Sequence, residues 1–440
     1  MRRIYEASAY RTPDTCWWRD ITPPSAQPQL DGDHRTEVAI IGGGFTGLNA
    51  ALSLANAGVE TTVIDAEQPG WGASGRNGGF CCLGGSKLGS TLLAQRFGND
   101  ERIAWHKAER AAVDHVDALL SDHQVDADRH SDGETLLAHS PKAMRDLRAS
   151  ADDAKAIYGV TPEIIPAEEL RQRGLGGAFH GGITTPIGFA LNPAKYHAGL
   201  ARAAQSGGAR LFGKTPAQSI TRTGASWRVA TPTGTITADK VILATNGYSS
   251  EDVPDWLRAR YLPVQSTIIV TRPITQSEQV HQGWTSLQMS YDSRILLHYF
   301  RLMPDGRFLF GMRGGLRATP DAEARLSRKI RADFHALFPE WRNIEITHEW
   351  SGLVCLMRSL TPFAGPVPDQ PGLFAAMGYH GNGVAMGSYL GARLADTVIG
   401  RPHRHPFPAF LSAPPARFPL GSLRRSLLAP AYAAAALFDR

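Results

Sequence analysis

The stretch that most constrains the fold runs from Thr36 to Phe80, TEVAIIGGGFTGLNAALSLANAGVETTVIDAEQPGWGASGRNGGF. Its first apolar run, Val38 to Ile41, has the length and composition of a buried parallel strand. Three glycines in the spacing G-x-G-x-x-G follow, then a helical pattern that Gly58 ends, then a second strand, Thr61 to Ile64. This succession predicts a strand–helix–strand unit at the start of a doubly wound sheet.

Each glycine of the motif has a physical role. Gly42 allows the tight turn, Gly44 lets the backbone approach a pyrophosphate, and Gly47 lets the helix pack close to the strand. The helix N-terminus offers unpaired N–H groups and positive dipole charge to phosphates. Asp65, 23 residues after Gly42, can accept the hydroxyls of an adenosine ribose. The sequence therefore predicts a dinucleotide site, with a glycine-rich packing turn as the alternative.

The loop after the second strand indicates which dinucleotide is bound. Residues 70–79 read GWGASGRNGG, and such small residues can bring several backbone N–H groups against a flat, electron-poor ring. With this loop the chain resembles the D-amino-acid oxidase/glycine oxidase superfamily of FAD-dependent oxidoreductases, and most of all its gamma-glutamylputrescine oxidase-like branch. The resemblance covers roughly residues 15 to 400. It implies FAD rather than NAD, with this loop beneath the flavin.

A second glycine-rich element lies near the C-terminus. Residues 374–387 read FAAMGYHGNGVAMG, which predicts a strand end, a turn, and a helix that begins near Val384. The N-terminus of that helix can carry partial positive charge. In the resembling family the corresponding element faces the pyrimidine edge of the flavin. Two elements roughly 300 residues apart thus fit one cofactor.

The resemblance extends the cofactor site to two further segments. Ala217 would place backbone near the adenine, and a buried strand that ends in Ala244-Thr245-Asn246 would bring its end close to the dinucleotide. The cofactor-binding residues predicted in this way are Gly42, Gly44, Phe45, Thr46, Gly47, Asp65, Ala66, Gly72, Ala73, Ser74, Arg76, Asn77, Gly78, Gly79, Ala217, Ala244, Thr245, Asn246, Gly381, Asn382, Gly383, Val384 and Ala385.

The other elements follow from hydrophobic periodicity. Helices are expected over 92–121 and 192–204, and a buried strand over 240–244. Strand-like runs over 261–271 and 295–310 predict an antiparallel sheet. The pattern is that of an α/β fold whose second domain is of the α+β type.

A chain of 440 residues is long enough for two domains. In the resembling family the chain leaves the nucleotide-binding domain and re-enters it. The predicted domains are a Rossmann-like FAD-binding domain, residues 1–90, 192–255 and 345–440, and a substrate-binding domain with an antiparallel sheet, residues 91–191 and 256–344.

The candidate catalytic residues belong to the substrate side. Arg301 lies beside Tyr299 on the predicted sheet, and an arginine is the usual reader of a carboxylate; an arginine paired to a structural acid is the alternative. His380 occupies a variable position of the C-terminal turn and can face the active site, or lie on the surface. Arg358, by resemblance to glycine oxidases, is a second candidate for the carboxylate, and Tyr248 can cap the pocket or simply pack.

The expected reaction is oxidation of the C–N bond of a small amine or amino acid, such as a gamma-glutamylputrescine-like amine, to an imine that water hydrolyses. The cofactor carries the hard step, so no general base is assigned. The alternatives are an imino-acid or N-methyl amino-acid enzyme of the pipecolate or sarcosine type, a flavoenzyme of another class, or an FAD-binding protein without activity. A G-D-A-A-H motif, a redox cysteine pair and a second dinucleotide motif are all absent. Oxygen or another acceptor would reoxidise the flavin; Lys87 and Lys195 are the lysines considered near it.

Charge and apolar runs limit the partners. From Arg401 to Arg440 there are six arginines and one acid, so this tail carries the formal charge of +5 and the other 400 residues are near neutral. A broad nucleic-acid-binding face is therefore not expected, although the tail can contact an acidic surface, its own or a membrane's. Without an apolar h-region or a run of about 18 apolar residues, no signal peptide or membrane span is expected, and the cytoplasm is the expected location.

The cysteines and histidines indicate neither a metal nor a covalent flavin. The four cysteines form no C-x-x-C pair. A cysteine in the C-terminal part holds the flavin in sarcosine oxidases, but Cys355 is displaced from that position, so non-covalent FAD is expected. His403 and His405 lack a third ligand, and no metal is expected.

Overall fold

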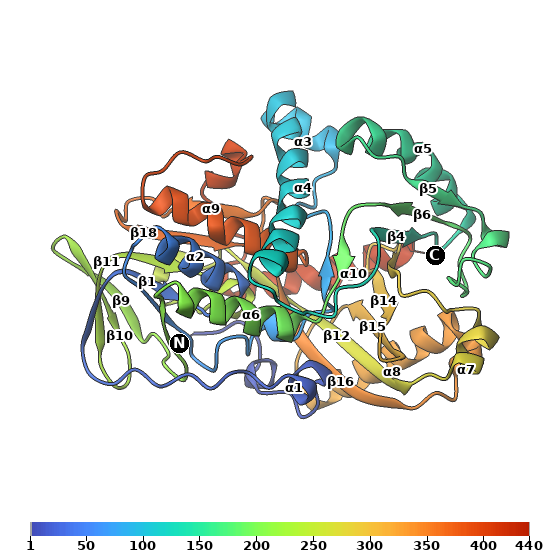
Figure 1. Cartoon of the computed structure of the whole chain (residues 1–440), viewed down its shortest axis with the longest axis horizontal. Coiled ribbons are helices and arrows are strands. Elements are labelled where there is room, and N and C mark those ends of the chain that lie inside the picture. Colours follow the sequence, from blue (N-terminus) through green and yellow to red (C-terminus); the bar gives the residue numbers. More distant parts are fainter. Residues whose placement is uncertain (1, 440) are drawn as a thin grey trace.

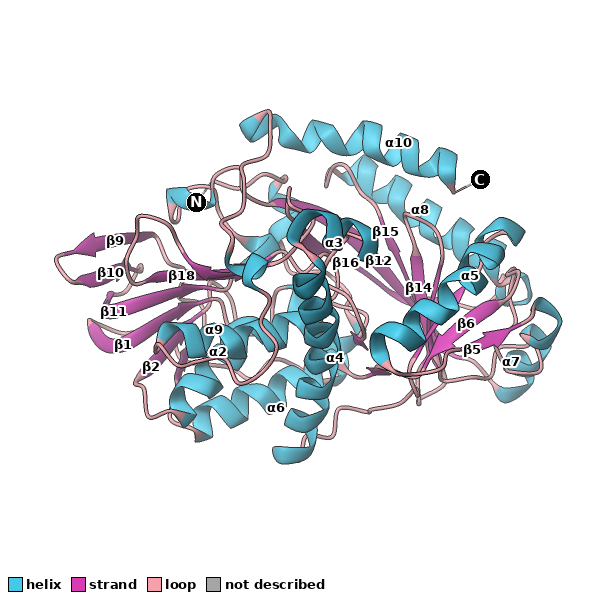
Figure 2. Cartoon of the chain, turned by 90° about the horizontal axis from the view of Figure 1, so that it is seen from above, coloured by secondary structure: helices cyan, strands magenta, loops and turns pink. Residues whose placement is uncertain are grey.

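The computed structural model describes residues 2–439 and contains two eight-stranded sheets and a short two-stranded ribbon. The first sheet lies at the left of Figure 1 and the second at the right. Helix α4 (Asn99–Asp122) stands between them in both views (Figures 1 and 2). The α/β fold class that the sequence predicts is confirmed.

The first sheet has a parallel centre in the order β18-β11-β1-β2-β8. Strand β17 pairs antiparallel with β18 at one edge, and the β9–β10 hairpin joins the sheet where β10 pairs with β11. The strands are β1 (His34–Ile41), β2 (Thr61–Ile64), β8 (Arg210–Phe212), β9 (Ser219–Thr223), β10 (Ser226–Ala230), β11 (Thr235–Leu243), β17 (Phe363–Pro366) and β18 (Leu373–Met377).

Three helices cover one face of this sheet: α2 (Phe45–Asn56), α6 (Pro193–Ser206) and α9 (Ser388–Val398) (Figure 1). Strand β1 is apolar without alternation because it is buried on both faces. Val38 and Ile40 pack into the core beneath the helices, while Ala39 and Ile41 pack into a second core on the other face.

The second sheet runs in the order β16-β12-β15-β14-β13-β4-β6-β5, and all its pairs are antiparallel except β13 with β4. Helix α8 (Pro320–Leu337) packs on one face through an aromatic core. The strands are β4 (Glu134–Leu137), β5 (Glu163–Ile165), β6 (Gly182–Thr185), β12 (Leu262–Pro273), β13 (Met289–Asp292), β14 (His298–Leu302), β15 (Arg307–Arg313) and β16 (Ile346–Leu356).

The remaining elements connect the two halves. The helix expected over 92–121 is wrong as a single element: Gly98, with φ +94°, separates α3 from α4. The domain limits stay a prediction. Strand β16 (Ile346–Leu356) lies within the predicted FAD-binding domain, which includes residues 345–440, yet it pairs with β12 in the second sheet. The other elements are α1 (Trp17–Ile21), α3 (Ser90–Phe97), α5 (Pro141–Tyr158), α7 (Gln276–Gln282), α10 (Leu428–Phe438), and the ribbon of β3 (Phe80–Cys81) with β7 (Phe189–Ala190).

Among residues 2–439, no helix combines the length and the hydropathy that a membrane span requires. The basic C-terminal segment contacts the protein itself. Helix α10 is labelled at the top of Figure 2. It packs through Leu428 against β12, and Arg425 pairs with Glu6 at 3.0 Å.

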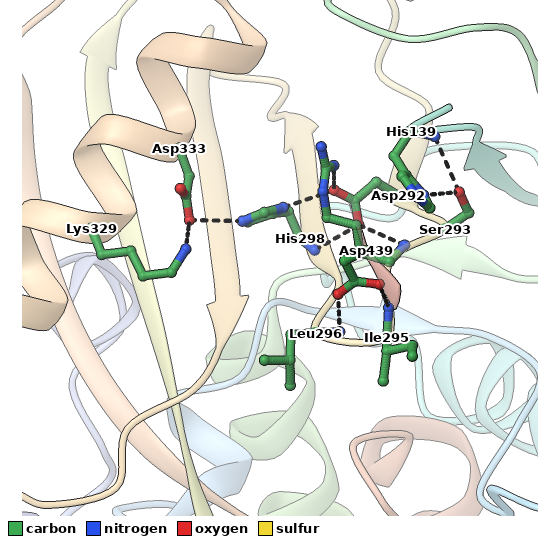
Figure 3. Close-up of polar contacts among 10 residues, drawn as sticks. His139, Asp292, Ser293, Ile295, Leu296, His298, Lys329, Asp333 and Asp439 are labelled. Carbon is green, nitrogen blue, oxygen red and sulfur yellow. Dashed lines mark hydrogen bonds and ion pairs between the residues drawn. The ribbon is translucent and has the colours of Figure 1, made fainter. Parts of the chain in front are cut away.

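A polar cluster holds the loop between β13 and β14 (Figure 3). His298 bridges two acids, with Nδ1 2.7 Å from Asp292 Oδ2 and Nε2 3.0 Å from Asp333 Oδ2. Arg294 and Lys329 pair with the same two carboxylates. Asp439, just after α10, accepts the N–H groups of residues 295 and 296, so the end of α10 is tied to this loop.

We expect this cluster to make stability depend on pH. Burial disfavours a charged imidazole, but the bonds to Asp292 and Asp333 outweigh it and raise the pKa of His298. A raised folded pKa stabilises below the unfolded value of about 6.5, and that contribution is lost as pH rises through the folded pKa. In thermal unfolding, His298→Gln should therefore destabilise by about 1–3 kcal/mol near pH 6 and by less near pH 9.

A matched control is His281→Gln, because His281 also pairs with an acid but its side chain is 72% exposed. The control should unfold like the parent protein at every pH. A difference between parent and His298→Gln that stays constant from pH 6 to 9 would contradict the assignment of charge to His298.

Candidate active site

The glycine-rich segments meet at one edge of the first sheet. Gly42 follows β1, Asp65 follows β2, Ala244 follows β11 and Gly378 follows β18. In open α/β sheets ligands bind outside the carboxyl ends of the strands. These ends surround a cavity whose empty space, open mouth included, is about 1450 Å³.

The glycine turn lets backbone approach backbone. Gly42 has φ +109°, and a Cβ there would lie 2.8 Å from the carbonyl oxygen of Ala244. At Gly44 a Cβ would meet Ser74 Oγ at 2.8 Å, and that hydroxyl accepts the N–H of Phe45. At Gly47 it would lie 1.9 Å from the Gly42 oxygen, so this glycine serves helix–strand packing and does not line the cavity.

The other requirements of a dinucleotide are also met along this cavity. The N-cap of α2, Gly44, has no side chain to cover the helix N-terminus, so that end is open to the cavity even though Ser74 Oγ accepts the N–H of Phe45. Asp65 is half-buried beside it; Oδ2 accepts the N–H of Gly43 at 2.8 Å and Oδ1 that of Glu67 at 3.0 Å. Burial raises the pKa of Asp65 to about 6, although these N–H groups favour the carboxylate. The residues present fit the FAD that the sequence implies.

The loop 70–79 is held rigidly between the two sheets. Arg76 stacks on Trp71 with 4.0 Å to the ring centroid and donates from Nε to the Trp71 oxygen. Asn77 donates to the oxygens of Ala73 and Ser74 and accepts the N–H of Gly79. Such a loop keeps its backbone groups in place before a ligand arrives.

The C-terminal turn is fixed against the first sheet. Asn246 accepts the N–H of Gly378 at 2.9 Å, which joins the ends of β11 and β18. Tyr379 accepts a hydrogen bond from the Thr46 hydroxyl, so the turn also contacts the start of α2. The turn then enters a π-helical segment, Gly383–Gly387, from which α9 continues, close to the helix start expected near Val384.

A second cavity of about 1070 Å³, its mouth included, adjoins the first. Six residues line both cavities: Ala73, Asn77, Leu353, Val354, Gly381 and Val384. This shared wall is where a flat ring would lie between the two cavities. The second cavity is therefore the candidate substrate site.

One face of the second sheet forms a wall of this second cavity. Tyr291 pairs with Tyr299, and Tyr299 with Gly311, so the residues of one parity share a face across neighbouring strands. The side chains of this face that line the cavity are Glu134, Ser266, Ile268, Tyr291, Tyr299 and Arg313.

Charged groups on this wall have few protein partners. Arg313 donates to the His380 oxygen at 3.2 Å, and burial lowers its pKa. Lys87 reaches the cavity from the loop after β3; burial and the nearby Arg313 lower its pKa to about 7. Tyr299 contacts Ser266 through the two hydroxyls at 2.9 Å, and burial raises its pKa to about 12. Two basic groups thus face a mainly apolar cavity.

The predicted site residues divide into three groups by position. Tyr299 lines the second cavity, and the cofactor residues Arg76, Gly78 and Asn382 line it without reaching the first. Gly47, Gly79, Ala385, Arg301 and His380 line neither cavity. The first cavity is lined by Gly42, Gly44, Phe45, Thr46, Asp65, Ala66, Gly72, Ala73, Ser74, Asn77, Ala217, Ala244, Thr245, Asn246, Gly381, Gly383 and Val384.

The structure places Arg301 on the wall of neither cavity, and its catalytic role stays a prediction. Arg301 is on the same strand face as Tyr299 but is fully buried. It donates to the oxygen of Leu191 at 2.8 Å and lies 3.0 Å from His130 Nε2, beneath the β3–β7 ribbon. Burial lowers its pKa to about 9. Its guanidinium supports the ribbon and does not reach the substrate side.

His380 also lines neither cavity, and its role at the active site stays a prediction. The ring is fully buried: Nδ1 lies 2.7 Å from the Gly85 oxygen, and Nε2 accepts the N–H of Met357. These partners require a neutral ring with its proton on Nδ1, in keeping with a pKa that burial lowers to about 4. His380 therefore joins the C-terminal turn to two neighbouring loops.

Sequence reasoning missed Arg313, Glu134 and Tyr291. The signal for Arg313 was alternation along β15, which places it on the same face as Gly311. The other weighed residues are placed as follows: Tyr248 lines the first cavity, Arg358 donates to the Arg417 oxygen on the surface, and Lys195 pairs with Asp128 away from both cavities.

Comparison with known proteins agrees with this geometry. The family model described as FAD dependent oxidoreductase matches residues 37–397. The probable oxidoreductase OrdL of Rhizobium meliloti (strain 1021) is 32% identical over 387 residues, which are 87% of this chain and 88% of that protein. Gamma-glutamylputrescine oxidoreductase of Escherichia coli (strain K12) is 27% identical over 394 residues, 88% of this chain and 89% of its own.

Solved structures show the same fold. Glycine oxidase from Geobacillus kaustophilus matches with a TM-score of 0.71 at 21% identity, covering 86% of this chain and 98% of its own. L-proline dehydrogenase from P. horikoshii matches with a TM-score of 0.69 at 18% identity, covering 86% and 96%. With the family model spanning most of the sequence and its cofactor cavity in place, the chain belongs to the FAD-dependent oxidoreductase family.

Proposed function

We propose that this FAD-dependent oxidoreductase oxidises the C–N bond of a small amine or amino acid to an imine, which water then hydrolyses, and that its substrate is a gamma-glutamylputrescine-like amine. The observation that carries the proposal is the wall shared by the two cavities. Asn77, Gly381 and Val384 face both, so a molecule in the second cavity lies directly against whatever ring occupies the end of the first. The relatives that match most of this chain include a gamma-glutamylputrescine oxidoreductase and several glycine oxidases.

FAD, when bound, supplies the redox chemistry. The chain's own residues bind, orient and desolvate. Arg313 and Lys87 attract an anionic substrate group, and in a water-poor cavity that attraction is stronger than in solution. Ile268, Leu297 and Leu353 supply apolar contact and exclude water. No side chain on this wall is needed as a general base, because a neutral amine loses no proton before oxidation.

We further propose that FAD is held without a covalent bond. Cys355 lines the first cavity, but its thiol is buried, and burial raises its pKa to about 12, so the nucleophilic thiolate is not formed. The loop 70–79 offers Arg76 and Asn77 and no histidine.

Anaerobic titration of the yellow protein tests the reaction. The panel contains gamma-glutamylputrescine, putrescine, pipecolate, proline, sarcosine, glycine and D-amino acids. Gamma-glutamylputrescine is expected to bleach the flavin band at about 450 nm. Admitting air then distinguishes an oxidase, whose flavin oxygen reoxidises, from a dehydrogenase, whose flavin needs another acceptor. Bleaching by pipecolate or sarcosine instead would indicate the imino-acid or N-methyl amino-acid alternative. Acid denaturation should release free FAD.

If dithionite bleaches the flavin and no amine does, the donor is of another class. Dithionite is the control because it reduces flavin without using the second cavity.

A further inference from the structure

The wall of the second cavity is chemically asymmetric. Arg313 is on β15, and Lys87 lines the same cavity close enough for the charge of Arg313 to lower the pKa of Lys87. Glu134 is on β4, which follows β15 in the order β15-β14-β13-β4. Three strand steps of 4.7–4.9 Å separate the two strands by about 14 Å. The cavity therefore has a cationic end and a carboxyl end.

Glu134 has bonding capacity that the protein does not use. Its residue is only 7% exposed and lines the cavity, yet Oε2 has no hydrogen-bond partner within the described part of the chain. Leaving a buried acceptor unpaired is unfavourable, because it has lost its bonds to water without gaining others. Burial raises the pKa of Glu134 to about 8 and the charge of Glu109 adds to this, while hydrogen bonding with Cys82 and Tyr291 lowers it only in part. The unused capacity is therefore that of Oε2.

A buried acid with a structural role looks different in this protein. Glu109 is also 7% exposed, but its Oε2 lies 2.8 Å from His106 Nδ1 and accepts the hydroxyl of Tyr158 at 2.8 Å. Glu109 is thus satisfied by its neighbours, whereas Glu134 faces a cavity with an unused oxygen. The difference points to a partner that comes from outside the chain.

The position of Glu134 fixes which part of a substrate it can meet. The reacting C–N bond lies by the shared wall, which includes Gly381 and Val384. Glu134 does not line the first cavity, and Tyr299 and Tyr291 lie between Arg313 and Glu134 across the strands. Glu134 therefore faces the end of the substrate that is remote from the reaction.

We propose that Glu134 is a specificity-determining residue whose carboxyl group accepts a hydrogen bond from a second amino or amide N–H group at the remote end of the substrate. This inference rests on the proposed function. It defines the substrate class as diamines, N-acylated diamines and diamino acids, that is, amines with a second nitrogen several bonds from the oxidised one. A substrate with an apolar remote end would leave the Glu134 oxygen unpaired and bind less well.

The test compares matched substrate pairs that differ only in a remote amino group. Putrescine is paired with pentylamine, and lysine with 2-aminoheptanoate. The parent enzyme should favour the amino-bearing member of a pair in kcat/KM. Glu134→Leu should lower kcat/KM for that member by about 10- to 100-fold and leave the apolar member unchanged or improved, because hydrogen bonds to charged groups are worth about 1.5–3 kcal/mol. Glu134→Gln keeps an acceptor and should fall between the two.

Control variants and a binding readout keep the test sharp. Glu163→Leu, on the exposed edge strand β5 of the same sheet, should leave the selectivity as in the parent. Unreactive analogues of each pair, titrated while the flavin spectrum is recorded, give dissociation constants that should show the same selectivity without turnover.

Two results would overturn the inference in different ways. If an amine bleaches the parent flavin but both Glu134 variants treat the two members of a pair as the parent does, the proposed function stands and the role of Glu134 falls. If no amine bleaches the parent flavin, the reaction fails, and the inference fails with it. A Glu134→Leu protein that does not fold is replaced by Glu134→Gln, which preserves volume and shape.

Discussion

Replacing Gly42 with alanine is expected to yield a folded protein that binds FAD at least about 100-fold more weakly, a loss of roughly 3 kcal/mol. Two effects add. The residue has φ +109°, where a side chain is strained, and the new Cβ would lie 2.8 Å from the carbonyl oxygen of Ala244. The oxygen belongs to the backbone at the end of β11, so no rotamer change relieves the contact. The 450/280 nm absorbance ratio of the purified protein and titration with FAD measure the effect.

The matched control is Gly58→Ala at the other end of α2. Gly58 also has a positive φ, +78°, but a Cβ there meets nothing within 4 Å and the position is remote from the cavity. This variant should lose about 1 kcal/mol of stability and keep its flavin. Equal flavin content in the two variants would show that the Gly42 turn does not hold the dinucleotide.

The cofactor cavity could be predicted from sequence because its signals are local. A spacing such as Gly42 to Gly47 sets a turn and a helix start directly, and Asp65 follows one strand later. The end of β18 and the turn near residue 380 carry a similar local pattern. Hydrophobic periodicity could not predict which of the residues on one face of a strand would line the substrate cavity.

Arg301 and Arg313 illustrate that limit. Both lie on the sheet face that carries Tyr299, and both are arginines that could bind a carboxylate. Only the β3–β7 ribbon decides between them, because it covers Arg301 and leaves Arg313 on the cavity wall. The ribbon joins residues near 80 to residues near 190, and a contact over that separation has no signature in a single sequence.

The break at Gly98 was missed for a different reason, since its neighbours continue the helical pattern on both sides.

The basic tail shows the same limit for charge. Composition left open which acidic surface the tail contacts, and in the structure Arg424 is fully buried. Its Nη2 lies 2.6 Å from Glu251 Oε1 and its Nη1 3.1 Å from Glu251 Oε2, and its Nε donates to the Tyr261 oxygen at 2.7 Å. The tail thus contacts the protein's own acid, which is one of the two surfaces that the composition left open.

Arg424→Met is expected to lower the free energy of unfolding by about 3–5 kcal/mol, because it leaves the buried carboxylate of Glu251 without its cation. Ser249, Ser250 and Val253, next to Glu251 in sequence, line the first cavity, so weaker FAD binding should accompany the loss of stability. Denaturant unfolding of the FAD-saturated protein measures the first effect, and FAD titration the second.

Arg35→Met provides the control, because Arg35 also pairs with an acid, Asp239, but at 3.7 Å and with side chains 76% and 55% exposed. Exposed pairs contribute little, so this variant should unfold like the parent. The double variant Arg424→Met with Glu251→Gln should recover part of the loss, because no unpaired charge is then buried. If Arg424→Met matched Arg35→Met, the tail would not be anchored through this pair. A loss that the second substitution left unchanged would assign it to the hydrogen bond with Tyr261 instead.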